Sequence, residues 1–202
     1  MGQPRQFDPE ERLDRAVNAF WEGGFEGVGM QQLGKAMDLF PGSIYGTYGG
    51  KRALFLKAID RYMATCSAEG LAVLDQRQHG FEAVRRYFAQ LIDGILNGKR
   101  KWGCLVTNTI VELSESDPEI KEKADGHLRR LETAFSGALD RSRQLGEISQ
   151  DTSEDWAAYL VCVVQGLNVI AKTKPSRQRL EAIVSAALSP LQLPGRPLPS
   201  GA

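Results

Sequence analysis

Apolar residues recur at spacings of three and four along almost the whole chain, and this periodicity constrains the fold more than any other feature. Leu13, Val17 and Phe20 show it early, and Leu54 and Ala58 continue it. Such spacing places residues on one face of a helix, whereas a strand would alternate with a period of two. We find no convincing strand pairs and no internal repeat. The sequence therefore predicts an all-α protein with about nine helices.

Proline and glycine mark the expected helix ends. Asp8 can cap the first helix and Pro9 suits its first position, whereas Gly23 and Gly24 end it. Residues 190–202 hold four prolines and two glycines, which predicts a disordered tail. The further helices are expected at about residues 30–37, 41–48, from 51 onward, 80–97, 103–113, 117–145, 153–172 and 176–188.

The composition is that of a folded soluble protein. Of 202 residues, 42% are hydrophobic and 25% are charged, which is ordinary for a globular chain. No run approaches the roughly 18 to 20 apolar residues that span a bilayer, and the N-terminus lacks the apolar core of a signal peptide. We therefore expect a cytoplasmic protein with no membrane partner.

The cysteines and histidines predict neither disulfides nor metal. Cys66, Cys104 and Cys162 are odd in number, far apart and without C-x-x-C spacing. Each lies in an apolar stretch, as a small buried thiol does. His79 and His127 have no partner residues at ligand spacing, so we expect no metal site and no cofactor.

Two short helices joined by three residues indicate a function. Asp38-Leu39-Phe40 separates the helices expected at 30–37 and 41–48, as in a helix-turn-helix. The second helix of that motif lies in the major groove and needs small residues and hydroxyls near phosphates. Residues 41–51 supply them, with Ile44 as the inward anchor. The positions expected outward or at the edge hold Ser43, Tyr45, Thr47 and Tyr48.

Charge gives this interpretation less support. Eight Lys and Arg residues balance eight Asp and Glu residues over positions 1–61, whereas DNA-binding domains usually carry a positive face. The segment from Gly29 to Arg52, however, contains three cationic residues and one anionic residue. Lys51 begins a helix, where the dipole disfavours a cation, so a phosphate partner explains it better. We expect modest phosphate neutralisation per subunit, which favours a dimer.

Three blocks within the first 55 residues carry a likeness to a known family. They run from Ala16 to Val28, from Leu33 to Met37 and from Gly42 to Phe55. In order and spacing they resemble the TetR family of bacterial transcriptional regulators, and Gly103 to Thr109 is similar to a stretch found in many members. The resemblance implies a ligand-responsive repressor that binds palindromic double-stranded operator DNA as a homodimer and releases it on binding a small-molecule effector.

The same resemblance implies a domain organisation. Residues 1–60 would be the helix-turn-helix DNA-binding domain and residues 61–189 the ligand-binding and dimerisation domain. Gln3-Pro4-Arg5 resembles a flexible arm that reaches toward DNA.

The resemblance also implies DNA-binding residues. At the start of the second helix, Gln31 and Gln32 would meet phosphate or a base edge. Those that would face the major groove are Pro41, Gly42, Gly46 and Thr47. Those that would hold the DNA backbone are Ser43, Tyr45, Tyr48 and Lys51. Gly29 departs from the usual Ser or Thr, so we expect a lost helix cap and a lost phosphate contact. Gly46 offers no side chain, so base readout there must come from its neighbours.

The helix at 153–172 is apolar around most of its circumference, which indicates burial on several sides. A second copy of the chain can supply the extra burial, and with residues 176–188 it could form a four-helix dimer bundle. A core helix of a monomer is the alternative. The residues expected at the dimer interface are Leu160, Val164, Leu167, Ile170, Ile183 and Ala187.

Polar and aromatic side chains within apolar helices are candidates for a ligand pocket. Glu112 could meet a cationic ligand or a surface Arg or Lys. Cys104 follows the basic run 99–101, and nearby cations raise thiol reactivity, so a redox or electrophile sensor is an alternative to an inert buried thiol. The candidate pocket residues are Trp102, Cys104, Asn108, Glu112, Trp156, Tyr159 and Gln165.

Two other classes of function are alternatives to a DNA-binding regulator. An enzyme would need a catalytic constellation, and the sequence has no clear carboxylate pair, nucleophile elbow, H-E-x-x-H motif or phosphate loop, so we predict no catalytic residues. A helical adaptor that kept the hairpin without binding DNA would suit the neutral charge and Gly29.

Overall fold

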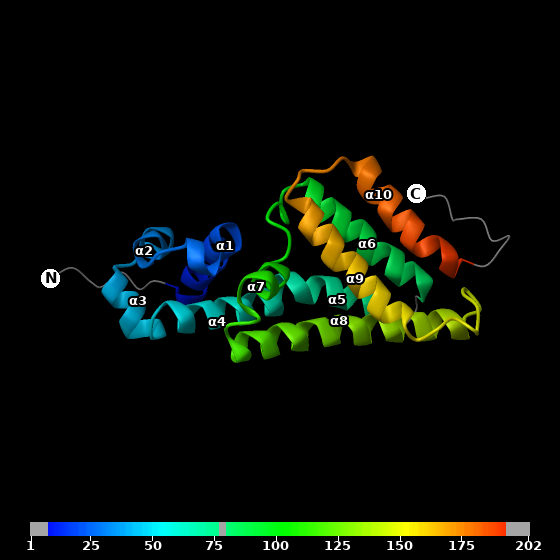
Figure 1. Cartoon of the computed structure of the whole chain (residues 1–202), viewed down its shortest axis with the longest axis horizontal. Coiled ribbons are helices and arrows are strands. Elements are labelled where there is room, and N and C mark those ends of the chain that lie inside the picture. The colour runs from blue at the N-terminus through cyan, green and yellow to red at the C-terminus, as the bar shows by residue number, and fades with distance from the viewer. Residues whose placement is uncertain (1–7, 77–79, 193–202) are drawn as a thin grey trace. The chain divides into compact units, whose positions relative to one another are not determined.

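Helices make up the architecture of this computed structural model, in which residues 8–76 and 80–192 are described (Figure 1). No strand occurs within those ranges, so the all-α prediction is confirmed. The elements are α1 Pro9–Gly27, α2 Met30–Met37, α3 Pro41–Tyr48, α4 Lys51–Tyr62, the π segment η1 Met63–Ser67, α5 Ala68–Leu74, α6 Phe81–Leu96, α7 Leu105–Leu113, α8 Pro118–Gln144, α9 Trp156–Ala171, α10 Arg177–Leu188 and the 3₁₀ turn η2 Ser189–Leu191.

The chain forms two compact units that no single cut in the sequence separates. The head unit contains residues up to Ala68 together with Cys104–Asp125, and the body unit contains Glu69–Gly103 and the residues from Gly126 onward. The sequence predicted a boundary near residue 60 instead. The difference arises because α7 packs against α1 and α4, and residues at the start of α8 form ion pairs with α4.

The predicted tail lies mostly outside the described residues. Its first residues belong to η2, where Leu191 is buried, so they are not a disordered continuation. Residues 193–202 and the expected arm Gln3-Pro4-Arg5 are outside the described ranges.

Aromatic rings hold the head unit together. The ring of Phe55 on α4 lies 4.9 Å from that of Phe20 and 5.0 Å from that of Phe25, both on α1. Trp21 meets Tyr62 edge to face at 4.9 Å. Phe20 and Phe55 are fully buried, and each contributes about 1.5–3 kcal/mol relative to exposure. The pairing of α1 with α4 is thus the frame on which α2 and α3 are mounted.

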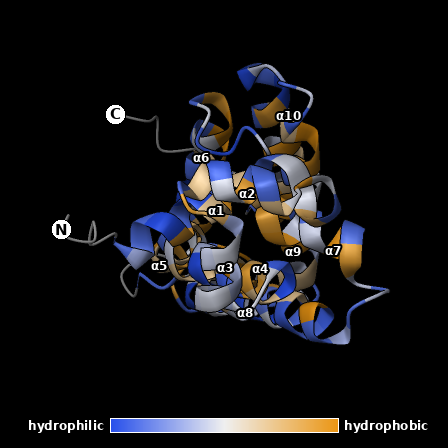
Figure 2. Ribbon diagram, turned by 90° about the vertical axis from the view of Figure 1, so that its left-hand side faces the viewer, coloured by the Kyte–Doolittle hydropathy of each residue, from blue (hydrophilic) through white to orange (hydrophobic). Residues whose placement is uncertain are grey.

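α9 is apolar around most of its circumference, and the part of its ribbon visible in Figure 2 is largely hydrophobic, but one of its faces lies in the body unit's own core. Leu160, Val164 and Leu167 are at most 2% exposed, and Ala187 on α10 is 3% exposed. These four were predicted at the dimer interface, but all are buried within one subunit. Leu160, Val164 and Leu167 pack in its core with residues of α6 and α8. Despite its apolar character, neither α9 nor any other helix in the described ranges is long and apolar enough to cross a membrane.

His127 is a buried titratable group of the body unit. It is 7% exposed, and its Nδ1 has no hydrogen-bond partner among the described residues. Burial, and secondarily the cations Arg130 and Arg100, lower the pKa of His127 to about 4.

We expect the protein to lose stability as the pH falls from about 6.5 toward 4. In that window His127 takes up a proton in the unfolded chain but not in the folded one, so protons favour unfolding, by about 3 kcal/mol at most. His127→Gln should flatten the pH dependence of the free energy of unfolding between these values, measured by urea denaturation. A profile parallel to that of the wild type would contradict this assignment.

Candidate nucleic-acid interface

The start of α2 lacks a side-chain cap, as the glycine at position 29 predicted. Gly29 is the N-cap residue, and its own N–H donates to Oε1 of Gln32 at 2.7 Å. Because the side-chain oxygen of Gln32 is used in this way, its NH₂ group is the part that can donate to a phosphate. Gln31 is exposed beside it.

The turn between α2 and α3 is fixed from inside the head unit. Asp38 adopts a left-handed conformation with φ 53°, and the N–H of Leu39 donates to the carbonyl of Gly34 at 2.9 Å. A Cβ at Gly34 would lie 2.7 Å from the carbonyl oxygen of Leu39, so the turn requires glycine there. Arg12 of α1 donates to the carbonyl of Met37 at 2.6 Å and pairs with Asp38 at 3.2 Å. The angle between the two helices is therefore tied to α1.

α3 has a buried face and an exposed face. Ile44 is fully buried, as predicted, while Ser43, Tyr45 and Thr47 are exposed. Tyr48 was expected at the outer edge, but it is only 8% exposed, and burial raises the pKa of its hydroxyl. The reason is helical periodicity, because Tyr48 lies four residues after Ile44 and shares its inward face.

Glycines of two kinds occur around α3. Gly49 and Gly50 have φ of 83° and 113°, which glycine adopts readily, and they allow α3 to end and α4 to begin. Gly42 and Gly46 lie inside the helix, and a Cβ at either would meet nothing within 4 Å. Each costs the helix about 1 kcal/mol relative to alanine. No contact among the described residues explains these two glycines.

Phe40 precedes α3 as its N-cap residue. It makes no side-chain cap hydrogen bond and is 83% exposed. Ser, Thr, Asp or Asn at this position would stabilise the helix by about 1 kcal/mol. Sequence reasoning missed Phe40, although its poor fit to a cap position was a usable signal.

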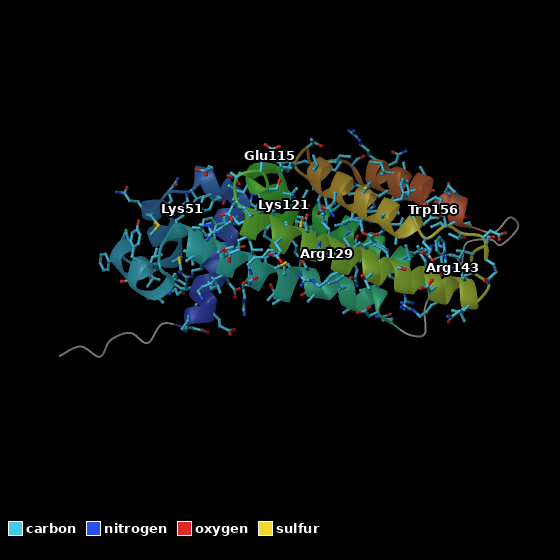
Figure 3. All side chains as sticks on the ribbon, turned by 60° about the horizontal axis from the view of Figure 1, so that its bottom comes forward. Lys51, Glu115, Lys121, Arg129, Arg143 and Trp156 are labelled. Atoms are coloured by element: carbon cyan, nitrogen blue, oxygen red, sulfur yellow. The ribbon has the colours of Figure 1, made fainter. Side chains whose placement is uncertain are left out.

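Lys51 is the first residue of α4 and is labelled in Figure 3. Its Nζ lies 4.5 Å from the centroid of the Phe25 ring, a cation–π contact that the sequence pattern did not predict. Phe25 therefore supports the ammonium group at a helix start where the dipole disfavours it.

Ion pairs use most of the head unit's other cations. Arg52 makes two hydrogen bonds to Asp117, at 2.7 and 2.9 Å, and they lower the pKa of Asp117 to about 2. In the described ranges, Lys35 and Lys57 have no ion-pair partner. The other pairs are Arg12–Asp38, Arg15–Glu11, Arg52–Glu119, Arg61–Glu10, Arg61–Asp14 and Lys123–Asp60. The cations in these pairs are thus held by acids within the head unit.

Glu112 of α7 binds the end of α1. Gly24 breaks the helical conformation of α1 with φ 74°, which frees the N–H groups that follow. Those of Phe25 and Glu26 donate to the two carboxylate oxygens of Glu112 at 3.0 and 2.7 Å. A Cβ at Gly24 would lie 2.9 Å from the carboxylate. Glu112 therefore meets backbone amides, neither the cationic ligand nor the surface Arg or Lys considered from the sequence.

Replacement of this carboxylate tests the contact. Glu112→Gln keeps one amide acceptor and loses the charge, so we expect a loss of about 1 kcal/mol in the free energy of unfolding, with weaker DNA binding because Phe25 no longer holds Lys51 firmly. Glu115→Gln, an exposed acid three residues later and labelled in Figure 3, is the matched control. Equal stability and DNA affinity of the two variants would show that the contact has no positioning role.

The candidate pocket residues are divided between the units. Cys104, Asn108 and Glu112 belong to the head unit. Cys104, the N-cap residue of α7, is 4% exposed, the ordinary position of an inert buried thiol. Those in the body unit are Trp102, Trp156, Tyr159 and Gln165, and the rings of Trp156 and Tyr159 lie 5.1 Å apart.

The head unit has the parts of a DNA-binding regulator: a rigid helix-turn-helix, a recognition helix with hydroxyls on a smooth outer face, and a supported cation beside it. Residues 13–58 match the family model described as bacterial regulatory proteins of the tetR family, and residues 80–187 match the tetracyclin repressor-like C-terminal domain. The chain belongs to the TetR family, and it is a helix-turn-helix transcriptional regulator.

Relatives agree over nearly the full length. An uncharacterized HTH-type transcriptional regulator of Bacillus subtilis, YezE, is 31% identical over 95% of this chain and all of its own. The repressor ComR of Escherichia coli is 26% identical over 93% of this chain and 90% of its own. Both relatives are HTH-type transcriptional regulators.

Solved structures show the same fold. CifR, a TetR family regulator solved as a cysteine mutant with 26bp operator DNA, is 29% identical, covers 93% of this chain and 98% of its own, and has a TM-score of 0.81. The reduced form of NemR from Escherichia coli is 21% identical, covers 94% of this chain and 100% of its own, and has a TM-score of 0.79.

Proposed function

We propose that this regulator represses transcription by binding a palindromic operator as a homodimer and releasing it when a small molecule binds. The observation that carries the proposal is the outer face of α3, where Ser43, Tyr45 and Thr47 are exposed around two unobstructed glycines. Hydroxyls are suitable donors to phosphates, and the small residues let the helix backbone come close to DNA.

Few unpaired cations serve this surface. Lys51 beside α3 and Lys35 on α2 are the candidates for phosphate contact. Two such contacts per subunit give four per dimer, for which log K would fall with log salt with a slope of about −3.6. This modest attraction is why two head units must bind together.

Lys51→Met tests the phosphate contact. Methionine can keep the stem against Phe25 while the charge is removed, so we expect weaker operator binding and a salt slope reduced by about two for the dimer. Lys57→Met removes an exposed cation of the same helix and should leave the slope unchanged. The DNA is obtained by selecting bound genomic fragments with purified protein, and affinities follow from fluorescence anisotropy. An unchanged slope in Lys51→Met would remove Lys51 from the interface, and failure to select any DNA would overturn the proposed function.

We assign the dimer surface to the exposed face of α9. Cys162, Gly166 and Val169 follow Tyr159 at spacings of three, four and three, so they share one face. Val169 is 53% exposed and Tyr159 46%. A Cβ at Gly166 would meet nothing within 4 Å, which leaves room for a close helix from a second copy. Half-buried Ile170 lies beside this face on α9. Half-buried Ile183 of α10 packs against the body unit's core, and both residues stay in the proposed interface.

Val169→Lys should separate the subunits. An unpaired cation at each symmetric contact would weaken self-association by roughly a hundredfold, and operator affinity would fall with it. Leu145→Lys, at a residue 55% exposed after α8, is the matched control. Sedimentation velocity measures the association. A dimer as stable as the control's would move the interface elsewhere.

The effector is proposed to act on the body unit, which contains most of the match to the C-terminal domain model. Trp156 on α9 is half-buried against the body unit's apolar core, a setting suited to a small molecule with an aromatic or apolar body.

A further inference from the structure

We propose that Phe40 determines sequence specificity by contacting the 5-methyl group of a thymine in each half-site. The proposal rests on the operator binding proposed above and names a base contact that it leaves open. Phe40 lies outside the set of DNA-binding residues that the family resemblance implied.

Phe40 is the most exposed large apolar side chain among the described residues, at 83%. A single exposed apolar residue needs no explanation by itself. Phe40, however, also occupies the N-cap position of α3, where it makes no side-chain hydrogen bond and a small polar residue would stabilise the helix. The residue type therefore runs against local helix stability.

The neighbouring face of α3 is smooth. Gly42 and Gly46 are four residues apart, exposed, and without obstruction at the Cβ position. Neither has a positive φ, so the backbone does not require glycine. Three positions within seven residues thus depart from helix preference without an internal reason, which is a pattern expected at a functional surface. Gly42 and Gly46 have no side chains that could reach a base. On the face of α3 that they form, base contacts must therefore come from residues at its edge.

The chemistry of a phenyl ring selects its partner. Residues at the N-terminal end of a recognition helix contact base edges in the major groove, and Phe40 directly precedes α3. A phenyl ring has no hydrogen-bond donor or acceptor for the polar edges of adenine, guanine or cytosine. Thymine alone among the four bases presents a methyl group there. The exposed ring of Phe40 is therefore complementary to thymine.

Replacement of thymine by deoxyuridine removes that methyl group and nothing else. Each thymine of the selected operator is replaced in turn, with the symmetric position replaced in the other half-site. We expect one position at which wild-type affinity falls about fourfold per half-site, the value of one buried methyl group. In Phe40→Ala the same replacement should have no effect, while Phe40→Leu should retain part of it.

Controls separate this contact from other roles. Val111→Ala removes an apolar side chain 81% exposed on α7 and should keep the wild-type ratio of thymine to deoxyuridine affinity. Thermal unfolding and sedimentation of Phe40→Ala should match the wild type, because an exposed side chain supports neither the core nor the dimer. A loss of self-association in Phe40→Ala would overturn the proposal by assigning the ring to a second copy.

Two further outcomes would overturn it. Equal wild-type affinity for thymine and deoxyuridine at every position would exclude a methyl contact while leaving operator binding intact. Retention of the full discrimination by Phe40→Ala would assign the methyl contact to another side chain, with Tyr45 the nearest exposed ring in sequence.

Discussion

The carboxylate of Glu112, which accepts hydrogen bonds from the backbone N–H groups of Phe25 and Glu26, is the contact that fixes the end of α1 in the head unit. Gly24 interrupts α1, and the amides beyond it would lack acceptors without α7. The ring of Phe25, which this contact holds in place, lies 5.0 Å from that of Phe55 and makes the cation–π contact with Lys51. One acidic side chain thus connects α7, the end of α1 and the start of α4.

The paired cations of the head unit hold its helices in position, and they are not available to attract DNA. Arg12 fixes the turn before α3, and Arg52 joins α4 to the start of α8 through Asp117. Exposed pairs of this kind contribute little stability each, about 0–1 kcal/mol, but they set register where the geometry is bidentate. The head unit contains 10 Lys and Arg residues against 14 Asp and Glu residues and so has no net positive charge. Discrimination between sequences must therefore come from short-range contacts made by the exposed face of α3.

Local signals in the sequence predicted the helices, but contacts between residues far apart in the sequence could not be predicted. Pro9, Gly49 and Gly50 act within one turn of chain, so the ends that they define could be predicted. Tyr48 was assignable in principle, since its spacing from Ile44 places it inward. The contact of Glu112 with Phe25 joins residues that are 87 positions apart, and no local sequence pattern predicts it.

Apolar helices posed a different difficulty. The sequence of a mostly apolar helix such as α9 does not show which of its faces packs in the core of its own subunit. Leu160 and Val164 were therefore predicted at the dimer interface, although they are buried in the core of one subunit. Only the packed subunit shows which face is left over. The same holds for the candidate pocket, because its residues come from segments that the two units divide between them.

The glycines of this protein are of two kinds: contacts within the subunit require some of them, whereas no such contact requires the others. At Gly24, Gly34 and Gly50, a positive φ or a close carbonyl oxygen explains the residue within the subunit. Gly42, Gly46 and Gly166 have open space at Cβ and no unusual φ, yet all three lie inside helices, where glycine is destabilising. Residues that lower stability without an internal reason are explained by what approaches from outside. The partner proposed for α3 is DNA, and the partner proposed for α9 is a second copy of the chain, so both proposed surfaces contain helical glycines that no contact within the subunit requires.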